Sequence, residues 1–132
     1  MGLKPLKKIL LVDDDPDILT IVKYCLERQI NVAVSCAQSG EEAMKIVLLI
    51  HPDLIILDVL MPKMDGVALY KAIRRIPDFA LIPIVFFTAS RIQESDIQEY
   101  LDLGAAGVIA KPFDPMTLSS QIQAIWERKQ KS

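Results

Sequence analysis

The sequence is poor in the residues that most often build metal sites and disulfide frameworks, with only two cysteines and one histidine among 132 residues. Cys25 and Cys36 have no metal-ligand spacing and no further cysteines to form a framework, so we expect two buried, reduced thiols. The single histidine, His51, stands directly before Pro52. We expect it to be a solvated residue at a helix end rather than a phosphotransfer site.

Long hydrophobic runs are also absent. The apolar stretches at 47–50 and 84–87 fall far below the ~20 residues that a membrane-spanning helix needs. The run at 9–12 stops at three aspartates, so it is too short for the core of a signal peptide, and a cytoplasmic location is expected. The formal net charge of −2 provides no general attraction to nucleic acid or to an anionic membrane.

Strand and helix patterns alternate along the whole chain. Continuous apolar runs predict buried strands at 8–12, 54–57 and 84–87, and a short fifth strand is predicted at 107–110. Alternation at 32–36 predicts a strand nearer the sheet edge. Capping signals and helical spacing predict helices at 16–28, 40–50, 66–75, 94–103 and from residue 114 onward, with fraying after about residue 129. Trp126 is expected at the margin of the apolar stripe of the last helix.

Five strand–helix units in strict alternation predict a single domain over residues 1–132, with a core at about 8–128. Crossovers between parallel strands are right-handed, which leaves few possible strand orders. We therefore predict an α/β fold, a doubly wound (βα)5 flavodoxin-like three-layer sandwich with a parallel sheet in the order 2-1-3-4-5.

Polar residues follow the predicted strands. Asp13 and Asp14 follow the first strand, and Asp58, Thr88 and Lys111 follow the third, fourth and fifth. Because parallel strands end at one edge of the sheet, these side chains should be neighbours there. Crowded carboxylates repel one another, and a hard divalent cation such as magnesium relieves that repulsion. A carboxylate can then act as a nucleophile toward phosphorus, with lysine and threonine directed at the phosphoryl charge.

Four motifs in this order resemble the signature of two-component response-regulator receiver domains, of the stand-alone CheY-like kind. They are Asp-Asp-Asp-Pro at 13–16, Asp-Val-Leu-Met-Pro-Lys-Met-Asp-Gly at 58–66, Thr-Ala at 88–89 and Lys-Pro-Phe at 111–113. The resemblance extends over about residues 8–128.

The resemblance implies a magnesium site and a phosphoacceptor. Asp58 corresponds to the phosphoacceptor and would also contact the metal. Asp14 corresponds to the direct metal ligand, and Asp13 would bind the metal through water. The backbone carbonyl of Leu60 would be the third protein ligand.

The resemblance also assigns the residues that bind the phosphoryl group. Thr88 would hydrogen-bond to it and move on activation, and Lys111 would form an ion pair with it. The Lys111–Pro112 bond is cis in the family. Val108 stands where the family usually carries a tyrosine or phenylalanine, so the coupling of threonine to an aromatic switch should be altered.

The expected function is a phosphorylation-dependent signalling switch in a two-component phosphorelay, which is not an enzyme although it assists its own phosphorylation and slow dephosphorylation. Its partners would be a histidine kinase or phosphotransfer protein and a downstream protein. That protein would bind the face formed by the helix at 94–103, the strand at 107–110 and the last helix. No helix-turn-helix segment is recognisable in the sequence, so we expect neither an output domain nor a nucleic-acid partner.

Two other classes of protein share part of this sequence pattern or of the predicted fold. Asp13-Asp14-Asp15 also resembles the start of haloacid-dehalogenase-type phosphatases, although those enzymes need further acidic motifs downstream. A flavodoxin-like flavin binder would share the fold. The loop after the first strand, however, is acidic and lacks the serine- and threonine-rich cradle that such proteins use for the flavin phosphate.

Overall fold

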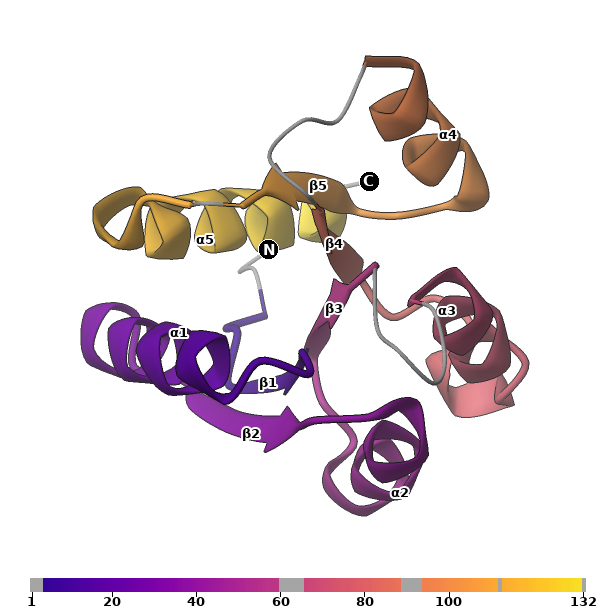
Figure 1. Ribbon diagram of the computed structural model, residues 1–132, viewed down its shortest axis with the longest axis horizontal. Coiled ribbons are helices and arrows are strands. Elements are labelled where there is room, and N and C mark those ends of the chain that lie inside the picture. The colour runs from indigo at the N-terminus through magenta and orange to yellow at the C-terminus, as the bar shows by residue number, and fades with distance from the viewer. Residues whose placement is uncertain (1–3, 60–65, 89–93, 112, 132) are drawn as a thin grey trace.

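The computed structural model describes residues 4–59, 66–88, 94–111 and 113–131, which form one parallel sheet between two layers of helices (Figure 1). The five strands lie in the order β2-β1-β3-β4-β5, as predicted. Their bounds are β1 (Lys8–Val12), β2 (Ala33–Ala37), β3 (Leu54–Asp58), β4 (Ile84–Thr88) and β5 (Gly107–Ala110). The α/β fold class and the strand order predicted from the sequence are confirmed.

Helices cover both faces of the sheet. One face carries α1 (Pro16–Gln29) and α5 (Pro115–Lys131), and the other carries α2 (Gly40–Ile50), α3 (Gly66–Arg74) and α4 (Glu94–Leu103) (Figure 1). Every residue of β3 and β4 is buried. Central strands covered on both faces are expected to be apolar throughout, which explains the continuous runs in the sequence.

Two helix starts follow the capping signals in the sequence. The Asp15 side chain accepts a hydrogen bond from the Asp17 amide at 2.9 Å, and Pro16 is the first residue of α1. At α2, the Ser39 hydroxyl accepts a hydrogen bond from the Glu42 amide at 3.1 Å. These caps determine where each helix begins after the preceding strand.

The structure corrects several local predictions. Trp126 is only 4% exposed and belongs to the core, so its predicted place at the margin is wrong. Its indole Nε1 donates a hydrogen bond to the Lys4 carbonyl at 2.8 Å, which attaches the N-terminal segment to α5. That helix continues to Lys131, past the point where we predicted fraying. Pro77 begins a short 3-10 helix, Pro77–Phe79, where the sequence indicated only the end of α3.

The sequence predicted the environment of the histidine correctly but not the burial of the two cysteines. Cys25 and Cys36 are free thiols, but both are half-buried rather than buried, which corrects the prediction. His51 is exposed and caps the C-terminal end of α2, with its backbone in the left-handed region at φ 47°. Its predicted position as an exposed residue at a helix end is confirmed. No helix in the described part of the chain is long and apolar enough to cross a bilayer.

Two side chains of α1 satisfy the backbone of the edge strand β2. The Glu27 carboxylate accepts hydrogen bonds from the Val34 amide at 3.0 Å and from Lys23 Nζ at 3.0 Å. Lys23 Nζ also donates to the Val34 carbonyl at 2.7 Å. The hydrogen bond from Val34 and then that from Lys23 hold the pKa of Glu27 below its usual value. Covering edge backbone groups in this way hinders pairing with a foreign strand.

We expect Glu27→Gln to lower the free energy of unfolding at about pH 7 by about 1 kcal/mol, because the charge-assisted bonds are lost from a partly exposed site. A carboxylate whose pKa is depressed in the folded state stabilises the folded protein at pH values above its unfolded-state pKa of about 4.3. That stabilisation is lost as the pH falls through the folded-state pKa. Urea unfolding should therefore show the difference between the two proteins shrinking as the pH falls through the folded-state pKa of Glu27.

Glu41→Gln is the matched control, because the contact that Glu41 makes with a described side chain is an exposed ion pair with Lys45 at 3.7 Å. It should change stability by less than about 0.5 kcal/mol. An equal loss from both substitutions would contradict a special role for the Glu27 contacts.

Candidate functional site

The site is built where four strands end. Asp13 follows β1, Asp58 and Thr88 are the last residues of β3 and β4, and Lys111 follows β5. The backbone ladder continues past the strands: the Asp13 amide donates to the Ala37 carbonyl at 3.1 Å, and the Lys111 amide donates to the Thr88 carbonyl at 2.8 Å. These bonds hold the functional residues on the rigid sheet rather than on free loops.

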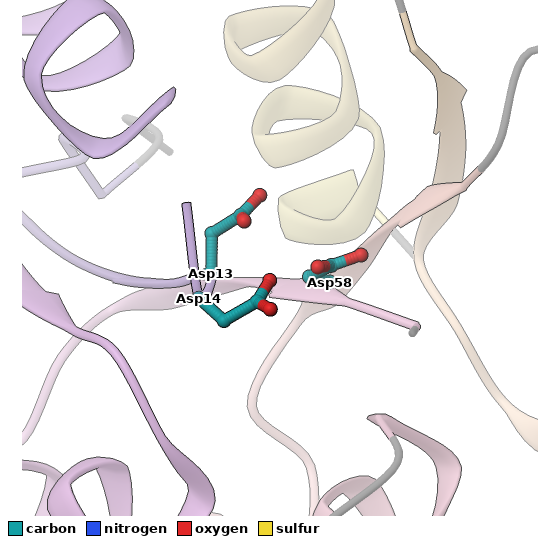
Figure 2. A group of neighbouring side chains, drawn as sticks. All are labelled: Asp13, Asp14 and Asp58. Atoms are coloured by element: carbon teal, nitrogen blue, oxygen red, sulfur yellow. The ribbon is translucent and has the colours of Figure 1, made fainter. Parts of the chain in front are cut away.

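Three carboxylates meet at this edge. Asp13, Asp14 and Asp58 each place one carboxylate oxygen within 4.8 Å of the others. Figure 2 shows Asp13 and Asp14 at the end of β1, beside Asp58 at the end of β3. Asp13 is completely buried, Asp58 is 5% exposed and Asp14 is exposed. The cluster therefore has an inner part within the protein and an outer part that solvent reaches.

Lys111 provides the cation of the site. Its Nζ lies 2.8 Å from Asp13 Oδ2 and 3.6 Å from Asp58 Oδ2, and its side chain is 25% exposed. Burial lowers the pKa of Lys111, but the hydrogen bond to Asp13 and the charges of Asp13 and Asp58 together outweigh burial and raise that pKa. Among the described residues, one ammonium group lies beside three carboxylates, which leaves an excess of negative charge.

The oxygen donors fit a hard divalent cation. Clustered carboxylates at this spacing are the ligands that Mg²⁺, Ca²⁺ and Mn²⁺ prefer, and a cation would offset the excess charge that Lys111 leaves. Asp14 is the accessible member. Asp13 already forms an ion pair with Lys111 and accepts a hydrogen bond from the Asp15 amide at 3.0 Å, so it is held in a fixed orientation.

Thr88 brings a buried hydroxyl to the same edge. The residue is 3% exposed, and its Oγ1 has no hydrogen-bond partner within the part of the chain that the structure describes. A buried polar atom without a partner costs free energy and calls for an explanation. A hydroxyl directed at a site that binds an anion would gain its partner when that anion arrives.

An aromatic pair beside the lysine was not singled out from the sequence. Phe87 and Phe113 stack with ring centroids 5.4 Å apart, and Lys111 Nζ lies 6.0 Å from the centroid of the Phe87 ring. Phe113 stands two residues after Lys111, so the Lys-Pro-Phe motif carried part of this signal. The position of Phe87 under the lysine depends on the sheet register, which pairs Phe87 with Ile109.

Not every predicted site residue can be placed. Leu60, whose carbonyl was expected to bind the metal, and Pro112, whose bond to Lys111 was expected to be cis, lie outside the described residues. Val108 lies half-buried on β5 at the position where an aromatic residue is usual. The side chains of Asp13, Asp14, Asp58 and Lys111 are brought together as predicted.

The fold and this site define a class of protein. A family model described as the response regulator receiver domain matches residues 9–123, and the chain belongs to that family. Receiver domains are regulatory switches, so this membership argues against the phosphatase and flavin-binding alternatives.

Among curated proteins, the chain is 40% identical over 124 residues to the alkaline phosphatase synthesis transcriptional regulatory protein PhoP of Bacillus subtilis, a match that covers 94% of this chain and 50% of that protein. It is 42% identical over 122 residues to the probable transcriptional regulator ycf27 of Cyanidium caldarium, covering 92% of this chain and 47% of that protein. The chain thus spans about half the length of the curated relatives that it matches.

Solved structures support the same assignment. The chemotaxis protein CheY4 of Vibrio cholerae matches with a TM-score of 0.83 and 32% identity, over 91% of this chain and 98% of that one. A putative response regulator from Chloroflexus aurantiacus matches with a TM-score of 0.82 and 35% identity, over 95% of this chain and 100% of that one.

We expect Lys111→Met to destabilise the metal-free protein by about 1–3 kcal/mol, because the buried Asp13 carboxylate loses its cation. Adding Asp13→Asn should recover most of the loss, since the buried charge is then removed as well. Urea unfolding in the presence of a chelator measures both effects as a double-mutant cycle.

Lys45→Met is the control, because the ion pair that Lys45 forms among the described residues, with Glu41, is exposed. Its effect should stay within about 0.5 kcal/mol. Strictly additive effects of Lys111→Met and Asp13→Asn would show that the two side chains do not interact.

Proposed function

We propose that this chain is a phosphorylation-dependent switch of a two-component phosphorelay in which Asp58 accepts a phosphoryl group from a histidine kinase or a phosphotransfer protein. The observation that carries the proposal is the meeting of Asp58 with two further carboxylates and Lys111 at one sheet edge. Family membership supports it independently.

The chemistry follows from the groups at the site. A carboxylate oxygen of Asp58 attacks the phosphorus, so a new oxygen–phosphorus bond forms while the bond from phosphorus to the donor histidine nitrogen breaks. The bonding electron pair leaves with that nitrogen, which takes up a proton. Asp58 carries one negative charge before transfer and about two afterwards. The burial of Asp58 means that this charge develops where water screens it poorly.

Lys111 and Thr88 can stabilise the added charge. Lys111 Nζ is nearer to Asp13 than to Asp58, at 2.8 Å against 3.6 Å. A phosphoryl group on Asp58 would draw the ammonium group toward itself and weaken its hold on Asp13. The Thr88 hydroxyl would donate a hydrogen bond to a phosphoryl oxygen and so gain the partner that it lacks among the described residues.

Magnesium is the metal we propose for the acidic cluster. Asp14 and Asp58 would hold it directly and the buried Asp13 through water, and the Leu60 carbonyl remains a prediction from the family resemblance. Bound there, Mg²⁺ would offset the carboxylate charge and the charge on the phosphoryl oxygens.

The downstream partner is proposed to be a protein that binds the α4–β5–α5 face. The described residues of α4 include none that is buried, so this helix has few core contacts to hold it in one position. Phosphorylation at the ends of β3 and β4 could therefore shift α4 at low cost. With Val108 in place of an aromatic side chain, the shift would be transmitted by the helix and its adjoining loops.

Incubation with acetyl phosphate and Mg²⁺ should add one phosphoryl group to the wild-type protein and none to Asp58→Asn, because the variant lacks the nucleophilic oxygen. Intact-mass spectrometry measures the gain directly. Asp78→Asn is the control, because Asp78 is an exposed residue of the 3-10 helix and is not part of the acidic cluster. This variant should be phosphorylated like the wild type. Phosphorylation of Asp58→Asn to the wild-type extent would refute the assignment.

Asp14→Asn should abolish the dependence of phosphorylation on Mg²⁺ and lower the initial rate by about tenfold or more, because the accessible ligand of the cluster is lost. The measurement is the initial rate of phosphorylation as Mg²⁺ is titrated. Asp17→Asn is matched to it, as an exposed aspartate three residues along that is outside the cluster. A normal Mg²⁺ response in Asp14→Asn would exclude Asp14 as a ligand.

A further inference from the structure

A hollow lies at the opposite end of the sheet from the acidic cluster. Its cavity volume is about 590 Å³, and it is walled by the C-terminal ends of α3, α4 and α5 and by residues 80–83, which lead into β4. The parallel strands enter the sheet at this end and leave it at the acidic cluster. The two sites are therefore separated by the length of the strands.

The hollow is basic although the protein as a whole is slightly acidic. Four cationic side chains line it, Lys71, Arg74, Arg75 and Lys129, and none of the described residues in its lining is acidic. Basic residues in or directly after the last turn of a helix complement the helix dipole, which accounts for each of them singly. The dipole does not account for their convergence from two helices on one cavity.

Apolar side chains form the other part of the lining. Leu81 is 95% exposed, and Leu103 is 37% exposed at the end of α4. Ile82 and Pro83 continue the apolar surface toward the start of β4. Because Leu81 is almost fully exposed to water, covering its side chain with a partner would contribute favourably to the free energy of binding.

The walls are tied together by hydrogen bonds. Arg74 donates through Nη1 to the carbonyls of Phe79 and Ile82, and through Nε to the Tyr70 hydroxyl at 3.1 Å. The Tyr70 hydroxyl in turn donates to the Leu103 carbonyl at 2.8 Å. These contacts join α3, the segment before β4 and the end of α4. Because these hydrogen bonds already hold the wall residues in place, the protein loses little conformational entropy when a ligand fills the cavity.

We propose that this hollow binds an acidic peptide segment of a partner protein. An apolar side chain of the segment packs against Leu81 and Leu103, and flanking carboxylates pair with Lys71 and Arg75. The combination of an apolar floor with a basic rim fits such a segment better than a nucleic-acid strand, whose phosphates need cations but not leucines. Binding there needs no phosphoryl group on Asp58, because the hollow lies at the other end of the strands.

The test uses a fluorescein-labelled peptide in which glutamates flank a pair of leucines, with a second peptide carrying glutamines in their place. Fluorescence anisotropy should show binding of the glutamate peptide that weakens as ionic strength rises, and much weaker binding of the glutamine peptide. Lys71→Glu with Arg75→Glu should weaken binding by about tenfold or more. Leu81→Ser should weaken it by about threefold or more, because the apolar contact is lost.

Lys45→Glu with Arg28→Glu is the matched control. It makes the same change in net charge at exposed positions of α2 and α1 outside the hollow, and it should change the affinity by less than about twofold. Thermal unfolding followed by circular dichroism checks that every variant is folded. Asp58→Asn should bind the peptide like the wild type, so failure of this proposal and failure of phosphoryl transfer are told apart.

Three results would overturn the proposal. The first is no binding of the glutamate peptide to the folded wild-type protein. The second is equal weakening by the two double variants, which would show attraction to the surface charge as a whole. The third is tighter binding of a single-stranded oligonucleotide than of the peptide, with that binding lost in the variant that carries Lys71→Glu and Arg75→Glu.

Discussion

The structure depends on one electrostatic constraint: within the part of the chain that the structure describes, three carboxylates share a sheet edge with a single lysine. One carboxylate oxygen from each of Asp13, Asp14 and Asp58 lies within 4.8 Å of the others, and Lys111 contacts two of these residues. The arrangement is tolerable only if a cation or a redistribution of charge offsets the repulsion. That makes the edge responsive, because any group that binds there changes the balance of forces on Lys111 and on the strand ends.

The rigidity of the sheet allows small changes at this edge to matter. Strands β3 and β4 are wholly buried, so Asp58 and Thr88 are held by packing on both faces. The described residues of α4, in contrast, include none that is buried. A protein that combines a firm site with a loosely packed helix can convert a local change of charge into movement of that helix.

The two ends of the strands have opposite chemical characters. The carboxyl ends carry the acidic cluster, and the amino ends carry a basic hollow braced by Arg74 and Tyr70. Tyr70 also touches α4, since its hydroxyl donates to the Leu103 carbonyl. The end of α4 thus forms part of the hollow, which places the helix between the proposed phosphorylation site and the proposed peptide site.

The sequence by itself located the strands, the helix caps at Asp15 and Ser39 and the residues that cluster at the strand ends, because strand period, capping chemistry and residues at strand ends are local signals. The strand order followed from the strict alternation of strands and helices together with the handedness of parallel crossovers. Tertiary structure alone decided how deeply side chains are buried. Trp126 became core, and Cys25 and Cys36 stayed half-exposed. It also decided which partner Lys111 prefers, that Phe87 lies beneath it, and that four cations converge around the basic hollow. Burial and contacts between distant residues depend on how helices pack across the sheet, which no local pattern encodes.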